Sequence, residues 1–235
     1  MAMQRASLSI TVIEQLQWRH TQSIGNLTSL VQIYLAANNL KGTIPHEIGD
    51  LSKVQILSLP GVNVHGVIPP TTFNMSSLIR ISLASNQLSG SLPVNIGLGV
   101  PNLKQLLVSG NNLTGAIPNF ISNASNIITT DMAANYFSGF IRSRLCALPN
   151  LERLNLSDNQ LNVDTSAPEV NFFSCLANLR NLGTLLLAKN PLNALLPISF
   201  GNLSTSLQYI DLSESNVRGD IPYDIGNMSS LSALF

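Results

Sequence analysis

The sequence has few charged residues, and this shortage excludes whole classes of partner. Charged residues make up 10% of the 235 residues, and 12 Lys and Arg cancel 12 Asp and Glu. A neutral, charge-poor surface provides no electrostatic basis for binding nucleic acid or anionic lipid. No apolar run approaches the roughly 20 residues of a membrane-spanning helix. Residues 1–21 also lack the uninterrupted apolar core of a secretory signal, so we expect an atypical N-terminal segment there, neither a clear signal nor a cap.

A repeat of about 24 residues accounts for most of the chain. Its units begin at regularly spaced apolar residues, which are Leu30, Val54, Leu78, Leu103, Ile127, Leu151, Leu182 and Leu207. The steps between them are 24, 24, 25, 24, 24, 31 and 25 residues, and a ninth unit begins at Leu231. A single short unit cannot bury its own apolar face, whereas stacked units bury a continuous core. Residues 22–235 are therefore predicted to form one solenoid domain of about eight full repeats and a partial ninth.

The unit reads L-x-x-L-x-L-x-x-N-x-L-x-G-x-I-P, and each fixed position has a physical reason. The L-x-L segment alternates with a period of two, which predicts a short strand with its leucines inward. The Asn is expected to be buried, with its amide bonded to backbone groups of adjacent turns. These residues are Asn38, Asn86, Asn111, Asn135, Asn159 and Asn190. The column fails at Val62 and Ser215, where Asn63 and Asn216 follow one residue late, so these two turns are expected to be irregular.

Glycine and proline recur in the second half of the unit. The glycines, which allow a tight bend, are Gly42, Gly66, Gly90, Gly115, Gly139 and Gly219. The prolines, which suit a short edge strand or an extended return path, are Pro45, Pro69, Pro93, Pro118, Pro197 and Pro222. Because nearly every unit contains this pair, an array of long helices with a similar period is excluded.

The motif L-x-G-x-I-P followed by I-G-N-L occurs at residues 40–45 with 48–51, and in part at 219–222 with 225–228. On these residues the chain resembles the plant-type leucine-rich-repeat ectodomain. Such ectodomains occur in receptor-like kinases, receptor-like proteins and polygalacturonase-inhibiting proteins. The long sixth unit, with NVDT at 162–165 and FFSCLAN at 172–178, resembles the expanded repeat of immune-receptor-like receptor kinases. The resemblance implies an α/β-type right-handed superhelix, with short parallel strands on the concave face and 3-10, loop and short helical segments on the convex face.

The resemblance also implies a function. It indicates a non-catalytic recognition module in defence or developmental signalling, at the outer face of the plasma membrane or in the apoplast. The implied partner is a peptide or protein ligand, with a co-receptor ectodomain as a further candidate. Family members usually begin with a signal peptide and a cysteine-paired cap, which we do not find, and the sequence stops inside a repeat, so we expect a partial ectodomain. A secreted polygalacturonase-inhibitor-like protein and a truncated receptor remnant remain alternatives.

No motif for catalysis is found in the sequence. The Gly-rich loop, catalytic-loop Asp and Asp-Phe-Gly of a kinase are missing, as is G-x-S-x-G. The three histidines lie far apart without acidic or thiol companions, so neither a metal site nor a cofactor is expected. Cys146 and Cys175 fall on the convex side of consecutive units. A bridge would require Cα atoms about 4.4–6.8 Å apart, and we expect two buried free thiols instead.

The outward positions of the predicted strands are the candidate ligand-binding surface. Most are small or neutral, and the distinctive side chains are Tyr34, Arg80, Asp131, Arg153, Tyr209 and Asp211. Tyr and Arg are frequent anchors of interfaces, and Leu107 and Leu186 are additional outward positions. The two arginines flank Asp131, which favours a peptide that carries charges of both signs.

Seven sequons are candidate glycosylation sites. They begin at Asn26, Asn74, Asn112, Asn123, Asn155, Asn202 and Asn227. Because the sequence is rich in Asn, Ser and Thr, and because Asn74, Asn202 and Asn227 belong to the repeat consensus, this count is weak evidence for secretion.

Overall fold

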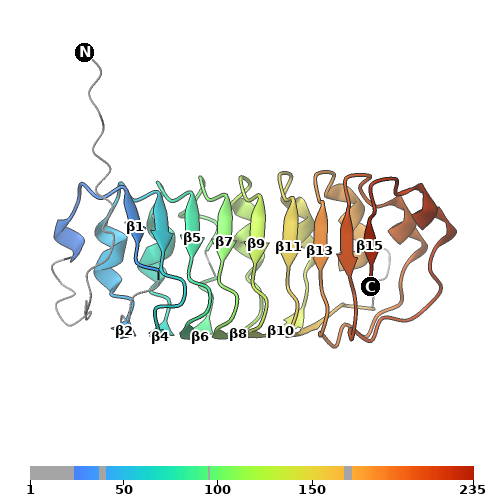
Figure 1. The fold of residues 1–235 in the computed structure, drawn as a ribbon, viewed down its shortest axis with the longest axis horizontal. Helices are drawn as coiled ribbons and strands as arrows, with labels where there is room; N and C mark the ends of the chain where they lie inside the picture. The colour runs from blue at the N-terminus through green and yellow to red at the C-terminus, as the bar shows by residue number, and fades with distance from the viewer. Residues whose placement is uncertain (1–23, 37–40, 95, 167–170) are drawn as a thin grey trace, which may run out of the picture.

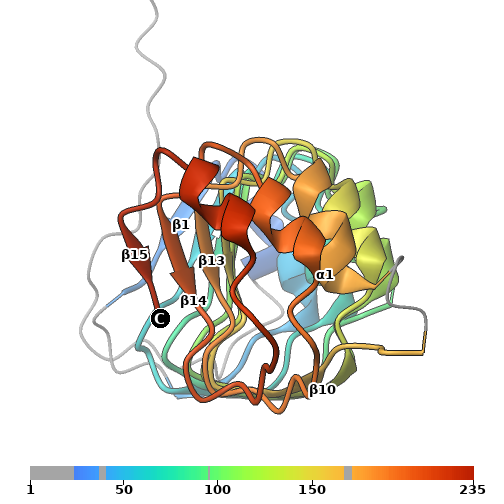
Figure 2. The same ribbon diagram turned by 90° about the vertical axis from the view of Figure 1, so that its right-hand side faces the viewer.

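The computed structural model describes residues 24–36, 41–94, 96–166 and 171–235, which form an elongated stack of coils (Figure 1). Each coil contributes one strand to a long parallel sheet, and short helices lie on the opposite side of the coil (Figure 2). The predicted N-terminal segment 1–21 lies outside the described residues, as do Asn38 and Leu40 of the first unit.

The long sheet consists of nine parallel strands in the order β1-β3-β5-β7-β9-β11-β13-β14-β15. We call the outward side of this sheet the concave face. The strands are β1 (Gln32–Tyr34), β3 (Ile56–Ser58), β5 (Arg80–Ser82), β7 (Gln105–Leu107), β9 (Thr129–Asp131), β11 (Arg153–Asn155), β13 (Thr184–Leu186), β14 (Tyr209–Asp211) and β15 (Ala233–Leu234). Each strand contains the first inward residue of an L-x-L segment, so the strand prediction is confirmed to within one residue.

A second parallel sheet runs along one edge of the coils, in the order β12-β10-β8-β6-β4-β2. Its strands are β2 (Gly42–Thr43), β4 (Val64–Val67), β6 (Gln87–Ser91), β8 (Asn112–Gly115), β10 (Tyr136–Phe140) and β12 (Gln160–Asn162). In Figure 1 they lie along the lower edge of the molecule. The sequence predicted only an extended return path or short edge strand here, and the structure shows that these segments pair into a sheet.

Short helices follow the extended return path in most of the described coils. They are η2 (His46–Asp50), η3 (Pro70–Asn74), η4 (Asn119–Asn123), η5 (Ser143–Ala147), α1 (Phe172–Cys175), η7 (Leu176–Asn178), η8 (Ile198–Asn202) and η9 (Tyr223–Asn227). All except α1 are 3-10 helices. Five consensus prolines, from Pro45 to Pro222, directly precede such a helix with ψ between 131° and 154°. Proline thus ends the extended path and starts the helical turn.

The core is a single continuous cluster through the stack. The eight apolar residues that begin the units, from Leu30 to Leu207, are each at most 1% exposed. The inward strand residues, such as Leu57 and Leu106, are fully buried in the same cluster. The predicted register of the repeat is therefore confirmed over all eight units.

The buried asparagines form a second, polar column. Within its own unit, Asn135 donates from Nδ2 to the carbonyl oxygens of Met132 at 3.2 Å and Ala133 at 3.0 Å. Toward the preceding unit it donates to the carbonyl oxygen of Val108 and accepts the N–H of Leu113, both at 3.0 Å. The amide therefore satisfies backbone groups that no sheet reaches, as expected.

The same pattern recurs in neighbouring units, which share acceptors. The carbonyl oxygen of Val108, for example, also accepts from Asn111 at 3.0 Å. Asn111, Asn135, Asn159 and Asn190 are all buried, while Asn86 is half-buried. Burial of the column is thus confirmed for four of its members.

The second unit is irregular, as expected from Val62 in place of Asn. The Oδ1 of Asn86 accepts the N–H groups of Val62 at 3.1 Å and Val64 at 3.2 Å, so it serves two donors instead of one. Asn63, the late asparagine, has a left-handed φ of 62°.

The eighth unit deviates in a related way. The hydroxyl of Ser215 donates to the carbonyl oxygen of Leu212 within the same unit, and Asn216 has φ 53°. Both expected irregularities are therefore confirmed. Asn193 in the seventh unit also has a left-handed φ of 50°, which the sequence did not predict.

Two glycines of the second sheet show why the repeat requires them. Gly66 and Gly90 both have φ 78°. A Cβ at Gly66 would lie 3.0 Å from Cγ2 of Thr43, and one at Gly90 would lie 3.0 Å from Cγ1 of Val67. Glycine thus permits the bend and makes room for a side chain of the preceding unit.

The expanded unit leaves the long sheet unchanged. Although 31 residues separate Leu151 from Leu182, β11 pairs directly with β13, with Arg153 opposite Thr184. The additional chain contributes α1, whose Phe172 and Phe173 are buried in the core. Phe173 packs edge-on against Phe200, with ring centroids 5.9 Å apart.

Candidate functional site

The six predicted ligand-binding residues all lie on strands of the concave face. They occur at the end of β1 (Tyr34), the start of β5 (Arg80), the end of β9 (Asp131), the start of β11 (Arg153) and the two ends of β14 (Tyr209 and Asp211). Arg153 and Tyr209 are exposed, as is Tyr34, whereas Arg80, Asp131 and Asp211 are half-buried.

Three of the six come together around a hollow of about 450 Å³. It spans β11, β13 and β14, and its lining consists of Arg153, Thr184, Leu186, Gln208, Tyr209, Asp211 and Ser232. Tyr34, Arg80 and Asp131 do not belong to it. The hollow combines a cation, an anion, an aromatic ring and several hydrogen-bonding groups.

Sequence reasoning missed two residues of this hollow, Gln208 and Ser232. Both precede the first outward strand position, which is Tyr209 in one unit and Ala233 in the next. The ring of Tyr209 packs against the ring of Phe235, and their centroids are 5.4 Å apart. Extending the set of outward positions by one residue would have included Gln208 and Ser232.

Three residues expected on the open surface are instead buried. Ser58, Ser82 and Ala188 occupy outward positions but are only 5%, 4% and 6% exposed. Small side chains in a closely spaced parallel sheet are covered by longer neighbours. The accessible part of the concave face is therefore smaller than the sequence predicted.

The two aspartates bind the backbone of their own strand ends. Oδ1 of Asp131 accepts the N–H of Ala133 at 3.2 Å. Oδ1 of Asp211 accepts the N–H of Ser213 at 3.0 Å and its hydroxyl at 2.6 Å. Asn155 makes the equivalent bond to the N–H of Ser157 at 3.2 Å. Because a neutral amide makes the same bond, this position requires an oxygen acceptor rather than a negative charge.

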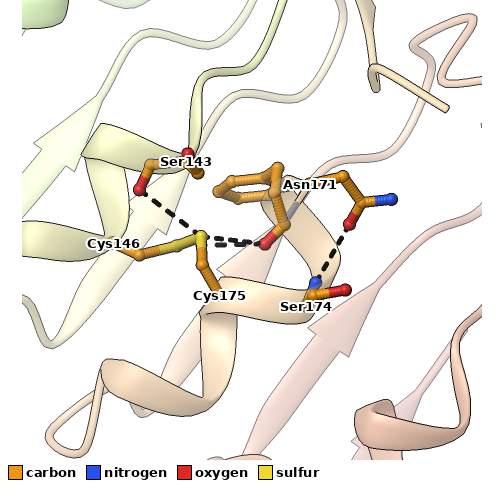
Figure 3. Close-up of a disulfide and its surroundings, with 6 residues drawn as sticks. Ser143, Cys146, Asn171, Ser174 and Cys175 are labelled. Carbon is orange, nitrogen blue, oxygen red and sulfur yellow. Dashed lines mark hydrogen bonds between the residues drawn. A yellow bond between two sulfur atoms is a disulfide. The ribbon is translucent and has the colours of Figure 1, made fainter. Parts of the chain in front are cut away.

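The cysteines form a disulfide on the convex side, so the expectation of free thiols is wrong. Cys146 of η5 and Cys175 of α1 have Cα atoms 5.8 Å apart, and their sulfurs are bonded (Figure 3). The sulfur of Cys175 also lies 3.1 Å from the carbonyl oxygen of Phe172. The expanded unit brings α1 beside η5, which spacing in the sequence could not show. Cys175 is also half-buried rather than buried.

Polar contacts hold the expanded unit next to the bridge. Asn171 accepts the N–H of Ser174 at 3.0 Å and thereby caps α1 (Figure 3). Before the helix, Asp164 accepts the hydroxyl of Ser166 at 2.6 Å and its N–H at 3.0 Å. The hydroxyl bond, followed by the backbone bond, lowers the pKa of the Asp164 carboxyl below its ordinary value.

Most sequons lie on the convex side. Asn74, Asn123, Asn202 and Asn227 are the exposed last residues of η3, η4, η8 and η9. Asn26 is exposed at the end of a 3-10 turn, and Asn112 is exposed at the start of β8. Asn155 differs from these six, because it is half-buried within β11 on the concave face.

Within the described residues, no group of three or more His, Cys, Asp or Glu is placed to hold a metal ion. The same part of the chain contains no helix that combines the length and the hydropathy needed to cross a membrane.

A scan against protein families matches the Leucine Rich Repeat model at residues 29–51, 102–124, 150–176 and 206–228. These four segments coincide with the first, fourth, sixth and eighth units of the repeat. The family model therefore agrees with the period read from the sequence and with the observed stacking of strands.

Among characterised proteins, the receptor kinase-like protein Xa21 of Oryza sativa subsp. japonica is 47% identical over 64 residues, 27% of this chain. The LRR receptor-like serine/threonine-protein kinase EFR of Arabidopsis thaliana is 38% identical over 87 residues, 37% of this chain. The matched segments span only 6% and 8% of those proteins.

A solved structure shows the likeness over most of the fold. It is the Arabidopsis receptor kinase HAESA in complex with the peptide hormone IDA and the co-receptor SERK1. The TM-score is 0.79 at 32% identity, covering 87% of this chain and 33% of that one. The chain is thus a leucine-rich-repeat solenoid related to segments of the ectodomains of plant receptor kinases.

Proposed function

We propose that the chain is a non-catalytic recognition module, part of a receptor ectodomain in defence or developmental signalling, which binds a peptide or protein ligand on its concave face. The domain would comprise residues 22–235. The proposed contacts are Tyr34, Arg80, Arg153 and Tyr209, because Asp131 and Asp211 are already bonded to their own backbone.

The hollow over β11, β13 and β14 carries this proposal. It lies on the concave face, outside the core, and its lining includes Arg153, Tyr209 and Gln208. The receptor kinase HAESA, whose structure is similar, was solved in complex with a peptide hormone and a co-receptor. By analogy, the ligand of this chain would be a peptide, and a co-receptor ectodomain would be a second partner.

An extracellular location is part of the same proposal. The Cys146–Cys175 disulfide is typical of proteins that mature in an oxidising compartment. The six exposed sequons lie outside the concave face and would accept glycans without covering it. We propose Asn26, Asn74, Asn112, Asn123, Asn202 and Asn227 as the sites used.

Selection from a random octapeptide library tests the function. We expect the full chain, produced by secretion, to enrich peptides over an albumin-coated surface. Thr184→Trp, in the lining of the hollow, should weaken their binding more than about tenfold, because the larger side chain would fill the site. Ala147→Trp, an exposed position of η5, is the matched control and should leave binding unchanged.

The fold of each variant is checked by circular dichroism. Failure to enrich any peptide would refute the proposal. Equal binding by wild type, Thr184→Trp and Ala147→Trp would place recognition somewhere other than this hollow.

A further inference from the structure

The register of the long sheet separates the charges of the concave face into two rows. One row, at the first residue of each strand, contains Arg80 and Arg153, connected through Gln105 and Thr129. The other row, two residues further along each strand, contains Asp131 and Asp211, connected through Asn155 and Leu186. Cations and anions thus lie along parallel lines rather than in mixed pairs.

The row of aspartates has a structural role that does not need its charge. Asp131, Asn155 and Asp211 each accept the N–H two residues on, at 3.0–3.2 Å. This bond closes the strand end in three units, whether the side chain is a carboxylate or an amide. The common feature of the row is therefore the acceptor oxygen.

The row of arginines has no such internal partner. Nε of Arg80 is buried and forms no hydrogen bond within the described part of the chain. The guanidinium of Arg153, which lines the hollow, likewise forms no hydrogen bond or ion pair with any described residue. A carboxylate is the group that satisfies a guanidinium best, through short charge-assisted bonds in a forked geometry.

We propose that Arg80 and Arg153 bind two acidic groups of one extended peptide that lies across the strands. This inference rests on the proposed function and specifies its ligand. The two arginines are three ladder steps apart, or roughly 14 Å at about 4.8 Å per step. An extended peptide advances about 3.4 Å per residue, so the two acidic groups should be about four residues apart.

The octapeptide selection described above tests this inference with the same full chain. The enriched peptides should share two Asp or Glu residues separated by about four positions. One representative peptide, labelled with a fluorophore, then reports affinity by anisotropy. Arg80→Gln and Arg153→Gln should each weaken binding about tenfold, the loss of one charge-assisted contact. Raising the salt concentration should weaken the wild type more than either variant.

Two further variants make the result specific. Arg144→Gln removes a cation of the same type from η5 on the convex side and should leave affinity unchanged. Asp131→Asn keeps the acceptor for Ala133 and should change affinity less than about twofold.

The possible failures are distinct. If no peptide is enriched, the proposed function itself fails. If peptides are enriched without acidic residues, or bind Arg80→Gln and Arg153→Gln as well as wild type, the function stands and the pairing with acidic groups is wrong. A loss with Asp131→Asn as large as that with the arginine variants would show a ligand of mixed charge, which also overturns the inference.

Discussion

Among the described asparagines of the column, Asn86 should contribute most to stability, because it also bonds to the unit in which Val62 takes the place of an asparagine. Replacing it with Ala removes the acceptor for the N–H groups of Val62 and Val64, which are both fully buried residues. It also removes the donor to the carbonyl oxygen of Leu59, which has no other hydrogen-bond donor among the described residues. Asn86→Ala therefore leaves three backbone groups unsatisfied.

The same change at Asn135 leaves one group unsatisfied, the N–H of Leu113. The carbonyl oxygens that Asn135 reaches keep other donors, such as Asn111 for Val108 and Asn159 for Met132. At about 1.5 kcal/mol for each orphaned buried group, Asn86→Ala should cost about 4–5 kcal/mol of unfolding free energy and Asn135→Ala about 1.5–2 kcal/mol.

Urea unfolding followed by circular dichroism measures these differences, and hydrogen exchange at the Val62 and Val64 amides locates them. Asn112→Ala, at an exposed position of β8, is the control and should change stability by less than about 0.5 kcal/mol. If Asn86→Ala costs no more than Asn135→Ala, the count of orphaned groups does not explain the role of this column.

Three more predictions concern the backbone, the disulfide and the glycans. Ala134 has φ 51° where the preceding unit has Gly110 at φ 66°, so Ala134→Gly should stabilise the fold by about 0.5–1 kcal/mol in urea unfolding, whereas Ala133→Gly should not. Cys146→Ser opens a bridge between residues 29 positions apart and should cost about 3–4 kcal/mol in the same assay, unlike Ser143→Ala on the same helix. In protein secreted from plant cells, glycopeptide mass spectrometry should find glycans on the six exposed sequons, Asn26, Asn74, Asn112, Asn123, Asn202 and Asn227, but none on Asn155, whose Oδ1 is bonded to Ser157; full occupancy of Asn155 would contradict this reasoning.

The sequence predicted the fold closely because the repeat encodes it many times over. The same leucine positions recur in every unit, so a single ambiguous residue, such as Val54 or Ile127, cannot alter the register. The positions where the Asn column fails were also informative, since the turns at Asn63 and Asn216 are irregular. Pairing of the return segments into a second sheet was not predicted, because it depends on how far one coil is displaced from the next.

The site was harder to predict, because side-chain surroundings do not repeat. The outward positions of the strands were identified, but Ser58 and Ser82 are covered by neighbours that only the packed sheet reveals. The disulfide was missed for a related reason. Cys146 and Cys175 approach each other only because the expanded unit forms α1 beside η5, and this depends on the path of a single exceptional segment.

The direct pairing of β11 with β13 determines how far apart side chains lie on the concave face. Arg153 and Thr184 lie opposite each other on adjacent strands of the sheet, although 31 positions separate them in the chain. A ligand that lies across the strands meets the same strand-to-strand spacing there as elsewhere. Distances along this face therefore depend on the number of strands crossed and not on the number of residues between them in the chain. Segments on the convex side can therefore change in length while the spacing between strands on the concave face stays the same.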